Sequence, residues 1–459
     1  MATRAVAMML AAGAALLAQQ GAPPGALTLA QAVEAALHNY PSIRISQEQI
    51  NAASAGMQLA RTAYLPRVDL LAQANRATRN NVFGLLLPQS TIPSMSGPVL
   101  GTNNLGTVWG SAVGTLVTWE PFDFGLRRAG TEAASAARTQ SEAALQRTEF
   151  DVSVATADAF VTLIAAQEMV RAARAGVDRS EVLLRTIGAL VEAEMRPGAD
   201  RSRAEAEMAA ARTQVIQAQQ AVEIARANLS RFAGLEPAQI TVFAGKLLEL
   251  PAGHVATALN TATNPASVEQ NAVVEQLRAQ LRILERSYFP RFYLQGSAYA
   301  RGTGAEVNGT NLGGLNGLAP KTQDYALGFT VTFPVADRPA LRAREAGQSA
   351  SIRAEEARYQ QIAADLKARW NVAVATLAGA RDVAANVPAE VSAARAATDQ
   401  ATARYRAGLG NIDDVAEAQR LLTQAEIDDA LALLGTWRGL LGVAAAGGDI
   451  RPFLAEASQ

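Results

Sequence analysis

The hydrophobic pattern of this chain changes from a helical period to a twofold period and back, and it does so twice. Apolar residues spaced by three and four predict an amphipathic helix over 29–37, and a second helix follows over about 42–64. Alternation of side chains with period two then predicts β-strands. These strands cover 68–75, 112–119, 292–299 and 325–333. Each half of the chain therefore contributes a predicted β-hairpin.

Each hairpin is followed by a very long segment of good helix formers. The first extends over about 126–194 and the second over about 340–406, so each helix would span about 100 Å at 1.5 Å per residue. Each ends at a turn that contains glycine, and return helices are predicted over 202–232 and 412–441. Pro388 lies inside the second long segment and predicts a kink or break there, because proline removes a backbone hydrogen bond.

The same order of elements in both halves indicates an internal duplication. Pro66 follows Pro41 by 25 residues, and Pro290 follows Pro265 by the same interval. The predicted parts are a first repeat over 27–233 with its hairpin at 66–121, a linker over 234–263, a second repeat over 264–442 with its hairpin at 290–334, and a tail over 443–459. The shorter helices of each repeat would pair end to end along the long helix and leave a gap near its middle. The linker and the tail would fill that gap as a belt.

The predicted strands have about ten residues, the length that a tilted strand needs to cross a bilayer. Aromatic residues stand near the strand ends, as in the aromatic girdles of membrane barrels. They are Trp109, Trp119, Tyr288, Phe289, Tyr299, Tyr325 and Phe333. The alternative is a soluble surface hairpin, which would show the same alternation. The loops over 77–108 and 302–324 are rich in Gly, Asn, Ser and Pro and fit external loops.

Four strands are too few to close a barrel across a membrane. An open sheet edge in lipid would leave unpaired backbone groups, each costing several kcal/mol. If the strands are membrane strands, the chain therefore has to form a homo-oligomer in which they close one shared barrel.

Composition narrows the function further. The net charge is −1, with 41 basic and 42 acidic residues, which gives no reason to expect a nucleic-acid partner. The apolar run from Ala5 to Ala18 is too short for a transmembrane helix and indicates a signal peptide over about 1–22. The chain has no cysteine and only two histidines, His38 and His254, so neither a metal site nor a cofactor is predicted.

The order of helix, Leu/Phe-Pro-Arg, hairpin, long helix, glycine turn and return helix, present twice, resembles the TolC-type outer-membrane efflux protein family. The resemblance covers about 27–442. It implies an α+β membrane protein in which the two β-hairpins contribute to a shared trimeric 12-stranded barrel, continuous with a long periplasmic α-helical coiled-coil tunnel. Such a protein is a passive exit duct in the cell outer membrane, serving a tripartite efflux pump or a type I secretion system. Its implied partners are a periplasmic adaptor, an inner-membrane transporter of the RND, ABC or MFS type, and outer-membrane lipid.

The two glycine turns are the candidate functional sites. The glycines Gly198 and Gly408 fit left-handed residues after helix ends. Ser202-x-x-Glu205 and Asn411-x-x-Asp414 resemble capping boxes that would start the return helices. From the residues alone, capping is therefore the leading explanation of Asp414 and of its neighbour Asp413.

The family resemblance adds functional roles at these turns. It implies that Asp414 and Glu417 form a cation-favouring pore constriction and that Tyr405 helps to close the tip. It also makes the turns adaptor-docking sites, with Arg196, Gly198, Arg406, Gly408 and Leu409 as candidates, although the arginines could equally cap helix ends. Two positions depart from the family pattern. Gly410 stands where a basic tethering residue is common, and Ala204 stands where an acidic residue is common.

Two other classes of function are compatible with parts of this pattern. A periplasmic coiled-coil scaffold or adaptor without a barrel would share the helices but not the membrane strands. An enzyme is a distant third, because the sequence shows no nucleophile elbow, phosphate loop or metal cluster. The cargo is not identified by the sequence, since drug, metal-ion, polysaccharide and protein export use similar ducts.

Overall fold

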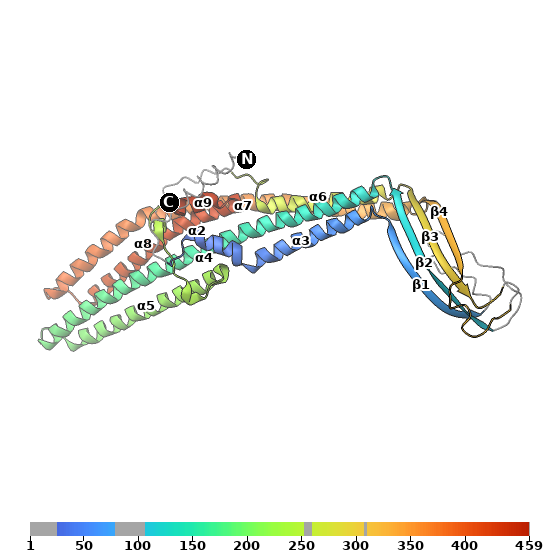
Figure 1. The fold of residues 1–459 in the computed structure, drawn as a ribbon. Helices are drawn as coiled ribbons and strands as arrows, with labels where there is room; N and C mark the ends of the chain where they lie inside the picture. The colour runs from blue at the N-terminus through green and yellow to red at the C-terminus, as the bar shows by residue number, and fades with distance from the viewer. Residues whose placement is uncertain (1–24, 79–105, 252–258, 307–309, 459) are drawn as a thin grey trace, which may run out of the picture. The chain divides into compact units, whose positions relative to one another are not determined.

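The structure is a computed structural model that describes residues 25–78, 106–251, 259–306 and 310–458 (Figure 1). In chain order the helices and strands are α2 (Leu29–Asn39), α3 (Pro41–Thr62), β1 (Arg67–Thr78), β2 (Thr107–Phe122), α4 (Leu126–Glu192), α5 (Gly198–Ala233), η2 (Pro237–Gln239), η3 (Gly245–Leu248), α6 (Pro265–Arg286), β3 (Arg291–Thr303), β4 (Thr322–Thr332), α7 (Arg338–Arg406), α8 (Ile412–Gly447) and α9 (Arg451–Ser458). The expected signal peptide and most of the first hairpin loop, 79–105, lie outside the described residues.

The chain divides into two compact units. The helical unit comprises Met1–Gln49, Glu142–Asn271 and Ala357–Gln459, and the sheet unit comprises Ile50–Ser141 and Ala272–Glu356. Both repeats contribute to both units, because the long helices α4 and α7 each continue from one unit into the other.

The sheet unit contains the two predicted hairpins joined into one antiparallel sheet. The strand order is β1-β2-β3-β4, so β2 and β3 join the two repeats. The register places Val68 beside Val117, Val117 beside Gly296, and Gly296 beside Leu327 on one face. This face is apolar because every second residue of each strand points to it.

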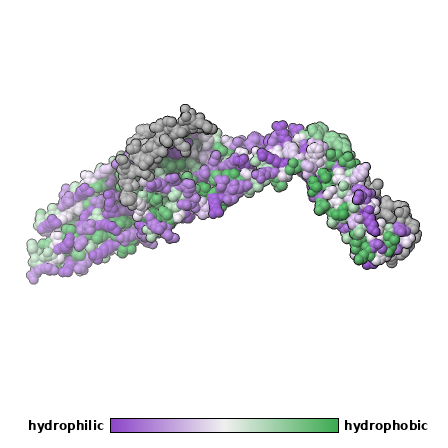
Figure 2. All heavy atoms as spheres, in the orientation of Figure 1, coloured by the Kyte–Doolittle hydropathy of each residue, from purple (hydrophilic) through white to green (hydrophobic). Residues whose placement is uncertain are grey.

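The two faces of the sheet differ sharply in polarity. On the apolar face, Leu70, Leu327 and Tyr325 leave 77%, 77% and 87% of their surface exposed, and hydrophobic side chains are visible along the strands in Figure 2. The opposite face carries Gln295 and the ion pair Arg301–Asp324, whose Nε and Oδ2 atoms lie 3.0 Å apart. A sheet that is apolar on its exposed side and polar on the other is the pattern of a membrane barrel wall, not of a soluble hairpin.

Aromatic rings gather at one end of the sheet. Five phenylalanines form a chain of contacts with ring centroids 4.6–6.0 Å apart, namely Phe122, Phe124, Phe289, Phe292 and Phe329. Beside them the Trp119 indole Nε1 donates a hydrogen bond of 3.1 Å to the backbone oxygen of Tyr64. The sequence pattern had pointed to Trp119 and Phe289 as strand-end aromatics, and both lie at this end.

Two asparagines join the shorter helices end to end within the helical unit. The Asn39 side-chain amide donates to the Ala233 oxygen at the end of α5 (3.0 Å), and the Asn264 amide donates to the Ala446 oxygen near the end of α8 (3.2 Å). In each repeat a proline begins the next helix, α3 at Pro41 and α6 at Pro265, where its missing N–H costs nothing. The gap expected between these helices is therefore absent, because their ends meet directly.

The main core of the helical unit lies where the belt segments cover the long helices. Trp437 of α8 is buried, contacts Phe453 of α9 edge to face, and donates its indole N–H to the Glu249 oxygen (2.9 Å). Phe160 and Leu163 of α4 are fully buried in the same cluster. The linker and the tail thus pack over the helices as a belt, although they do not fill a gap.

Helix α7 contains a proline, and helix α8 is unusually apolar. Helix α7 continues through Pro388 without interruption, so of the two outcomes predicted at that position, a kink or a break, the break does not occur. Val387, the preceding residue, is buried against Ala384 and Ala432, and this packing holds the chain helical across the lost hydrogen bond. Helix α8 is long and apolar enough to cross a membrane by composition, but 56% of its most apolar stretch is buried within the chain. It is the core helix of its unit.

Candidate functional site

The turns that follow the two long helices are built differently. The sequence pattern predicted the same feature for both, a left-handed glycine followed by a capping box. After α4, Glu194 takes the left-handed conformation with φ of 57°, and α5 begins at Gly198 directly after Pro197. Gly198 is therefore the first residue of a helix and not its terminator. Ser202 and Glu205 lie inside α5, so the capping box predicted there was wrong.

The second turn follows the prediction. Gly408 has φ of 76°, a left-handed value that favours glycine because it has no Cβ. Asn411 and Asp414 form a capping box at the start of α8, with the Asn411 N–H donating to Asp414 Oδ2 at 3.4 Å. The capping role expected of Asp414 from the sequence is confirmed.

A small hydrophobic cluster packs the two tips against each other. Its members come from all four helices of the tips, namely Leu183, Ile187, Ala204, Tyr405, Ile412 and Val415. Ala204 is 2% exposed in this cluster, which explains why alanine stands there: an acidic side chain would be buried without a partner, at high cost.

Tyr405 ties the two tips together with its ring and its hydroxyl. The hydroxyl donates a 2.8 Å hydrogen bond to Asp200 Oδ2 of α5. The Arg196 guanidinium lies over the ring, 4.3 Å from its centroid, and donates to the Tyr405 backbone oxygen at 2.5 Å. Burial raises the pKa of Tyr405 to about 12, and the Asp200 carboxylate is the second cause of the increase. The phenol therefore stays protonated and able to donate at physiological pH.

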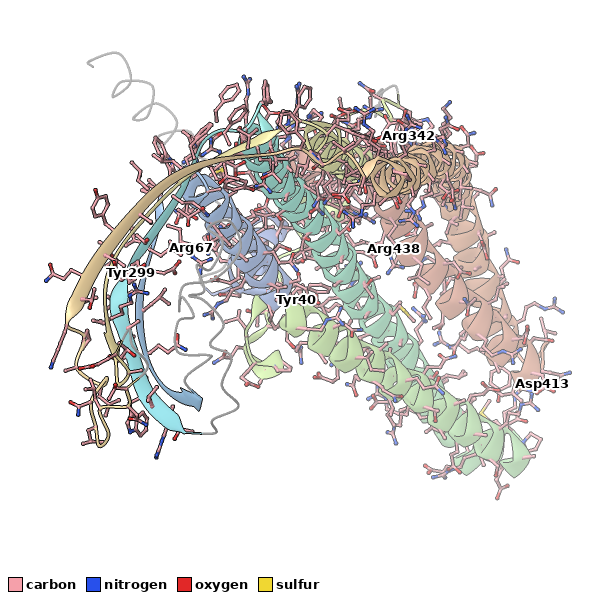
Figure 3. All side chains as sticks on the ribbon, turned by 90° about the vertical axis from the view of Figure 1, so that its right-hand side faces the viewer. Tyr40, Arg67, Tyr299, Arg342, Asp413 and Arg438 are labelled. Carbon is pink, nitrogen blue, oxygen red and sulfur yellow. The ribbon has the colours of Figure 1, made fainter. Side chains whose placement is uncertain are left out.

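A second tie crosses between the return helices. Arg203 of α5 forms an ion pair with Asp413 of α8, with Nε and Oδ1 3.0 Å apart, and Asp413 stands at the end of its hairpin in Figure 3. Both side chains are more than half exposed, so solvent screening limits the pair to about 0.2–1 kcal/mol. This contact joins the tips in a chain that has glycine, not a basic residue, at position 410.

The proposed constriction residues lie on the first turns of α8 and are exposed. Asp414 accepts a hydrogen bond from the backbone N–H of Asn411, the N-cap residue of α8. Glu417 forms an ion pair with Arg420 of the same helix. Within one chain these two carboxylates are therefore spaced along one helix face and not tied to the opposite tip. Among the described residues, no group of three or more His, Cys, Asp or Glu side chains could hold a metal ion.

The docking candidates separate into two groups. Gly198, Arg406, Gly408 and Leu409 are exposed, and Leu409 leaves 73% of its apolar surface open. Arg196 is half-buried and committed to Tyr405. The helix-end role that the sequence offered for Arg196 is confirmed, because the Tyr405 oxygen lies in the last turn of α7, and the same contact joins the two tips.

Sequence reasoning missed a further link between the long helices. Arg179 of α4 donates to Thr423 Oγ1 (2.9 Å) and pairs with Glu426 Oε2 (2.9 Å), both on α8. Arg395 of α7 lies 3.7 Å from the other Glu426 oxygen. Nothing in the local sequence marks these residues, because their partners are more than 200 positions away in the case of Arg179.

Comparison with known proteins settles what this arrangement belongs to. The sequence pattern of the outer membrane efflux proteins matches residues 32–235 and 260–437. The chain belongs to the outer membrane efflux protein family. No curated protein sequence gives a significant match.

Solved structures of outer-membrane channels share the fold of this family member. The Campylobacter jejuni CmeC channel is 17% identical with a TM-score of 0.73, covering 94% of this chain and 89% of its own. VceC from Vibrio cholerae is 17% identical with a TM-score of 0.70, covering 92% and 96%. The Neisseria gonorrhoeae MtrE channel, solved in an open state, is 19% identical with a TM-score of 0.69, covering 92% and 89%.

The family assignment fixes the general function. The chain is an outer-membrane efflux channel whose strands belong to a β-barrel shared by three copies and whose helices form a periplasmic tunnel domain. Channels of this family work with periplasmic adaptors and inner-membrane transporters. The family is a transport conduit, and the scaffold without a barrel is therefore set aside.

Proposed function

We propose that the two tips form the gate of this channel and that the ties around Tyr405 hold the gate closed. The observation that carries the proposal is the Tyr405 hydroxyl bound to Asp200 across the two hairpins. Arg196 on the Tyr405 ring and the Arg203–Asp413 pair support it, because they join the same two hairpins. Opening would separate these contacts, and a partner that binds the tips would supply the energy.

The exposed turn residues are the natural place for an adaptor to bind. Leu409 offers an open apolar side chain, and Arg406 and Gly408 stand beside it. An adaptor that inserts between the hairpins here would compete with the Tyr405 contacts. We propose that these residues, together with Gly198, dock the adaptor, and that Arg196 acts in closure.

Asp414 and Glu417 are proposed to give the gate its ion preference. Their spacing of three residues places both carboxylates on one face of α8. In a trimer, two carboxylates from each chain would line one constriction, and a ring of carboxylates favours cations. Asp414 can cap α8 and still border an aqueous pore, because its side chain is exposed.

Planar-bilayer recording tests this assignment. Purified trimers of the Asp414→Asn, Glu417→Gln double variant should lose most of their cation preference, measured as the reversal potential in a salt gradient. Asp429→Asn provides the matched control, since Asp429 is exposed further along the same helix and should leave the preference unchanged. An unchanged reversal potential in the double variant would refute the role of these two residues.

A further inference from the structure

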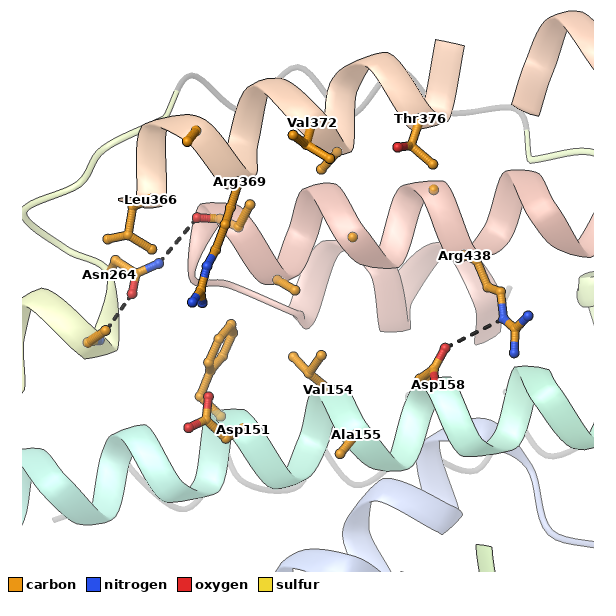
Figure 4. Close-up of a pocket in the computed structure, with 18 of the residues that line it drawn as sticks. Asp151, Val154, Ala155, Asp158, Asn264, Leu366, Arg369, Val372, Thr376 and Arg438 are labelled. Atoms are coloured by element: carbon orange, nitrogen blue, oxygen red, sulfur yellow. Dashed lines mark hydrogen bonds and ion pairs between the residues drawn. The ribbon is translucent and has the colours of Figure 1, made fainter. Parts of the chain in front are cut away.

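The helical unit contains a cavity that none of the roles above uses. Its volume is about 800 Å³, and its lining comes from α4, α7, α8 and the start of α6 (Figure 4). In the close-up, α4 and α7 stand on opposite sides and α8 lies between them. A cavity of this size is within the range of sites that take small organic molecules.

Small residues on α8 create the space. Gly439, Gly442, Ala445 and Ala446 contribute to the lining and place no long side chain in it. At Gly442 an added Cβ would meet only the Ala373 Cβ, at 3.7 Å. The sequence of α8 thus keeps this side of the cavity open.

The side walls of the cavity are mainly apolar. Phe150 and Val154 line it from α4, and Leu366, Val372 and Ala373 line it from α7. Val372 leaves 66% of its surface exposed in the chain, so apolar area is available to a ligand. Burying such area contributes about 25 cal/mol per Å².

Charged side chains stand among these apolar walls, and Arg369 acts on its neighbour Asp151 only through its charge. Arg438 pairs with Asp158 at 3.5 Å, and Arg147 pairs with Glu269 at 2.7 Å and with Asp151 at 3.6 Å. Arg369 makes no hydrogen bond or ion pair with the part of the chain that the structure describes. Figure 4 shows it extending from α7 toward Asp151.

Asp151 reports on the surroundings of Arg369. Burial raises the pKa of Asp151, and Arg147 and then Arg369 act in the opposite direction. The Asp151 side chain is 63% exposed, so this part of the cavity is open to water and a ligand can reach it. A free guanidinium offers five donors in a planar fork that matches a carboxylate.

We propose that this cavity binds organic anions, with the ligand carboxylate held by Arg369 and its apolar body lying between α4 and α7 beside the small residues of α8. Arg438 and Arg147 are paired with carboxylates, whereas Arg369 makes no hydrogen bond or ion pair with any described residue, which favours an anion over a cation at this position. The inference rests on the proposed function only in treating the ligand as cargo. The test measures binding and not transport. A failure of ligand binding is therefore distinguishable from a failure of the proposed gate.

The test uses three ligands that share one aromatic body. Isothermal titration calorimetry on the full-length trimer in amphipol would compare 2-naphthoate, neutral 2-naphthalenemethanol and cationic 2-naphthylmethylammonium. We expect 2-naphthoate to bind tightest. Arg369→Ala should weaken its binding about tenfold or more, the range expected for a hydrogen-bonded charge, and should leave the neutral ligand nearly unaffected.

Two further variants separate charge from shape. Val372→Trp should block all three ligands by filling the cavity, and the exposure of Val372 makes the change tolerable for folding. Lys367→Ala removes a positive charge from the same helix at an exposed residue outside the lining and should change nothing. Circular dichroism and elution as a trimer would verify folding. Equal binding of the anion and the cation, or no effect of Arg369→Ala in folded protein, would overturn the proposal.

Discussion

Tyr405 is the residue on which most of the tip contacts converge. Its ring is buried among residues from four helices, its hydroxyl contacts Asp200, and its backbone oxygen accepts from Arg196. A hydrogen bond to a charged group contributes about 1.5–3 kcal/mol. Loss of the hydroxyl alone should therefore change the closed state measurably while the ring keeps its packing.

Tyr405→Phe should raise the open probability of single channels at neutral pH, because the bond to Asp200 is lost. Alkaline pH should mimic this change in the wild type. The pKa of Tyr405 is raised from 10.0 to about 12, so the folded tip holds the proton more tightly than the unfolded chain. The stabilisation is complete below pH 10 and is lost as pH rises through about 12.

Single-channel recording from pH 8 to 12 would check this prediction. The wild type should open progressively above pH 10, and Tyr405→Phe should show no such step. Tyr359→Phe, on the same helix, is the matched control and should behave as the wild type. A pH step of equal size in Tyr405→Phe would contradict the assignment.

Arg203 and Asp413 offer a test of the second tie. Arg203→Ala and Asp413→Ala should each raise the open probability slightly, and a double-mutant cycle should give a coupling energy of about 0.2–1 kcal/mol, since both side chains are largely exposed. The charge-swapped double variant Arg203→Asp, Asp413→Arg should have a lower open probability than either single variant, because the ion pair is restored in reverse. Zero coupling would show that the ion pair does not contribute to closure.

At the scale of elements, the repeated asparagine explains the end-to-end junctions of the helices. Asn39 and Asn264 each bind a carbonyl oxygen at the end of a return helix, and each neighbours a glycine with positive φ, Gly234 at 70° or Gly448 at 84°. An added Cβ at Gly448 would lie 2.8 Å from the Asn264 amide nitrogen. The asparagine and the glycine thus form one joint in each repeat.

The joints should differ in their contribution to stability. Asn264 is 3% exposed whereas Asn39 is exposed, and removing the partner of a buried polar group costs about 1–3 kcal/mol. Asn264→Ala should therefore lower the free energy of unfolding by that amount, and Asn39→Ala by less. Denaturant titration would measure both, with Asn228→Ala on the exposed side of α5 as control. Equal losses at the two joints would contradict this account.

At the scale of the whole molecule, the two outer strands of the sheet govern assembly. Within the described residues, β1 pairs only with β2, and β4 pairs only with β3. Each outer strand therefore has one edge of unpaired backbone groups, which lipid cannot satisfy. Pairing of β4 with β1 of a neighbouring copy supplies the missing partner, and three copies close a barrel of twelve strands.

Cysteine cross-linking can check this closure cleanly, because the chain has no cysteine of its own. Double variants would carry one cysteine within 68–72 and one within 325–329. At positions where the two strands face each other, oxidation in native membranes should produce covalent trimers, provided that the Cα atoms lie about 4.4–6.8 Å apart. Single-cysteine variants should yield none. Covalent ladders beyond three chains would contradict the closed trimer.

Local patterns in the sequence were enough to locate the helices and strands, because hydrophobic period, proline and glycine are local signals. The four strands and both long helices lie where the periods placed them, and the Asn411–Asp414 cap was readable from four residues. The first tip was not readable in this way. Its left-handed residue is Glu194, and glutamate gives no indication of a left-handed turn. Gly198 is instead the first residue of α5.

Contacts between distant residues became apparent only in the folded chain. The pairs Tyr405–Asp200 and Arg203–Asp413 join positions about 200 residues apart, and the cavity beside Arg369 exists only because α8 brings small residues to the space between α4 and α7. Local patterns specify where a helix begins and which face is apolar. They do not specify the neighbour that the face will meet, because that choice depends on packing throughout the chain.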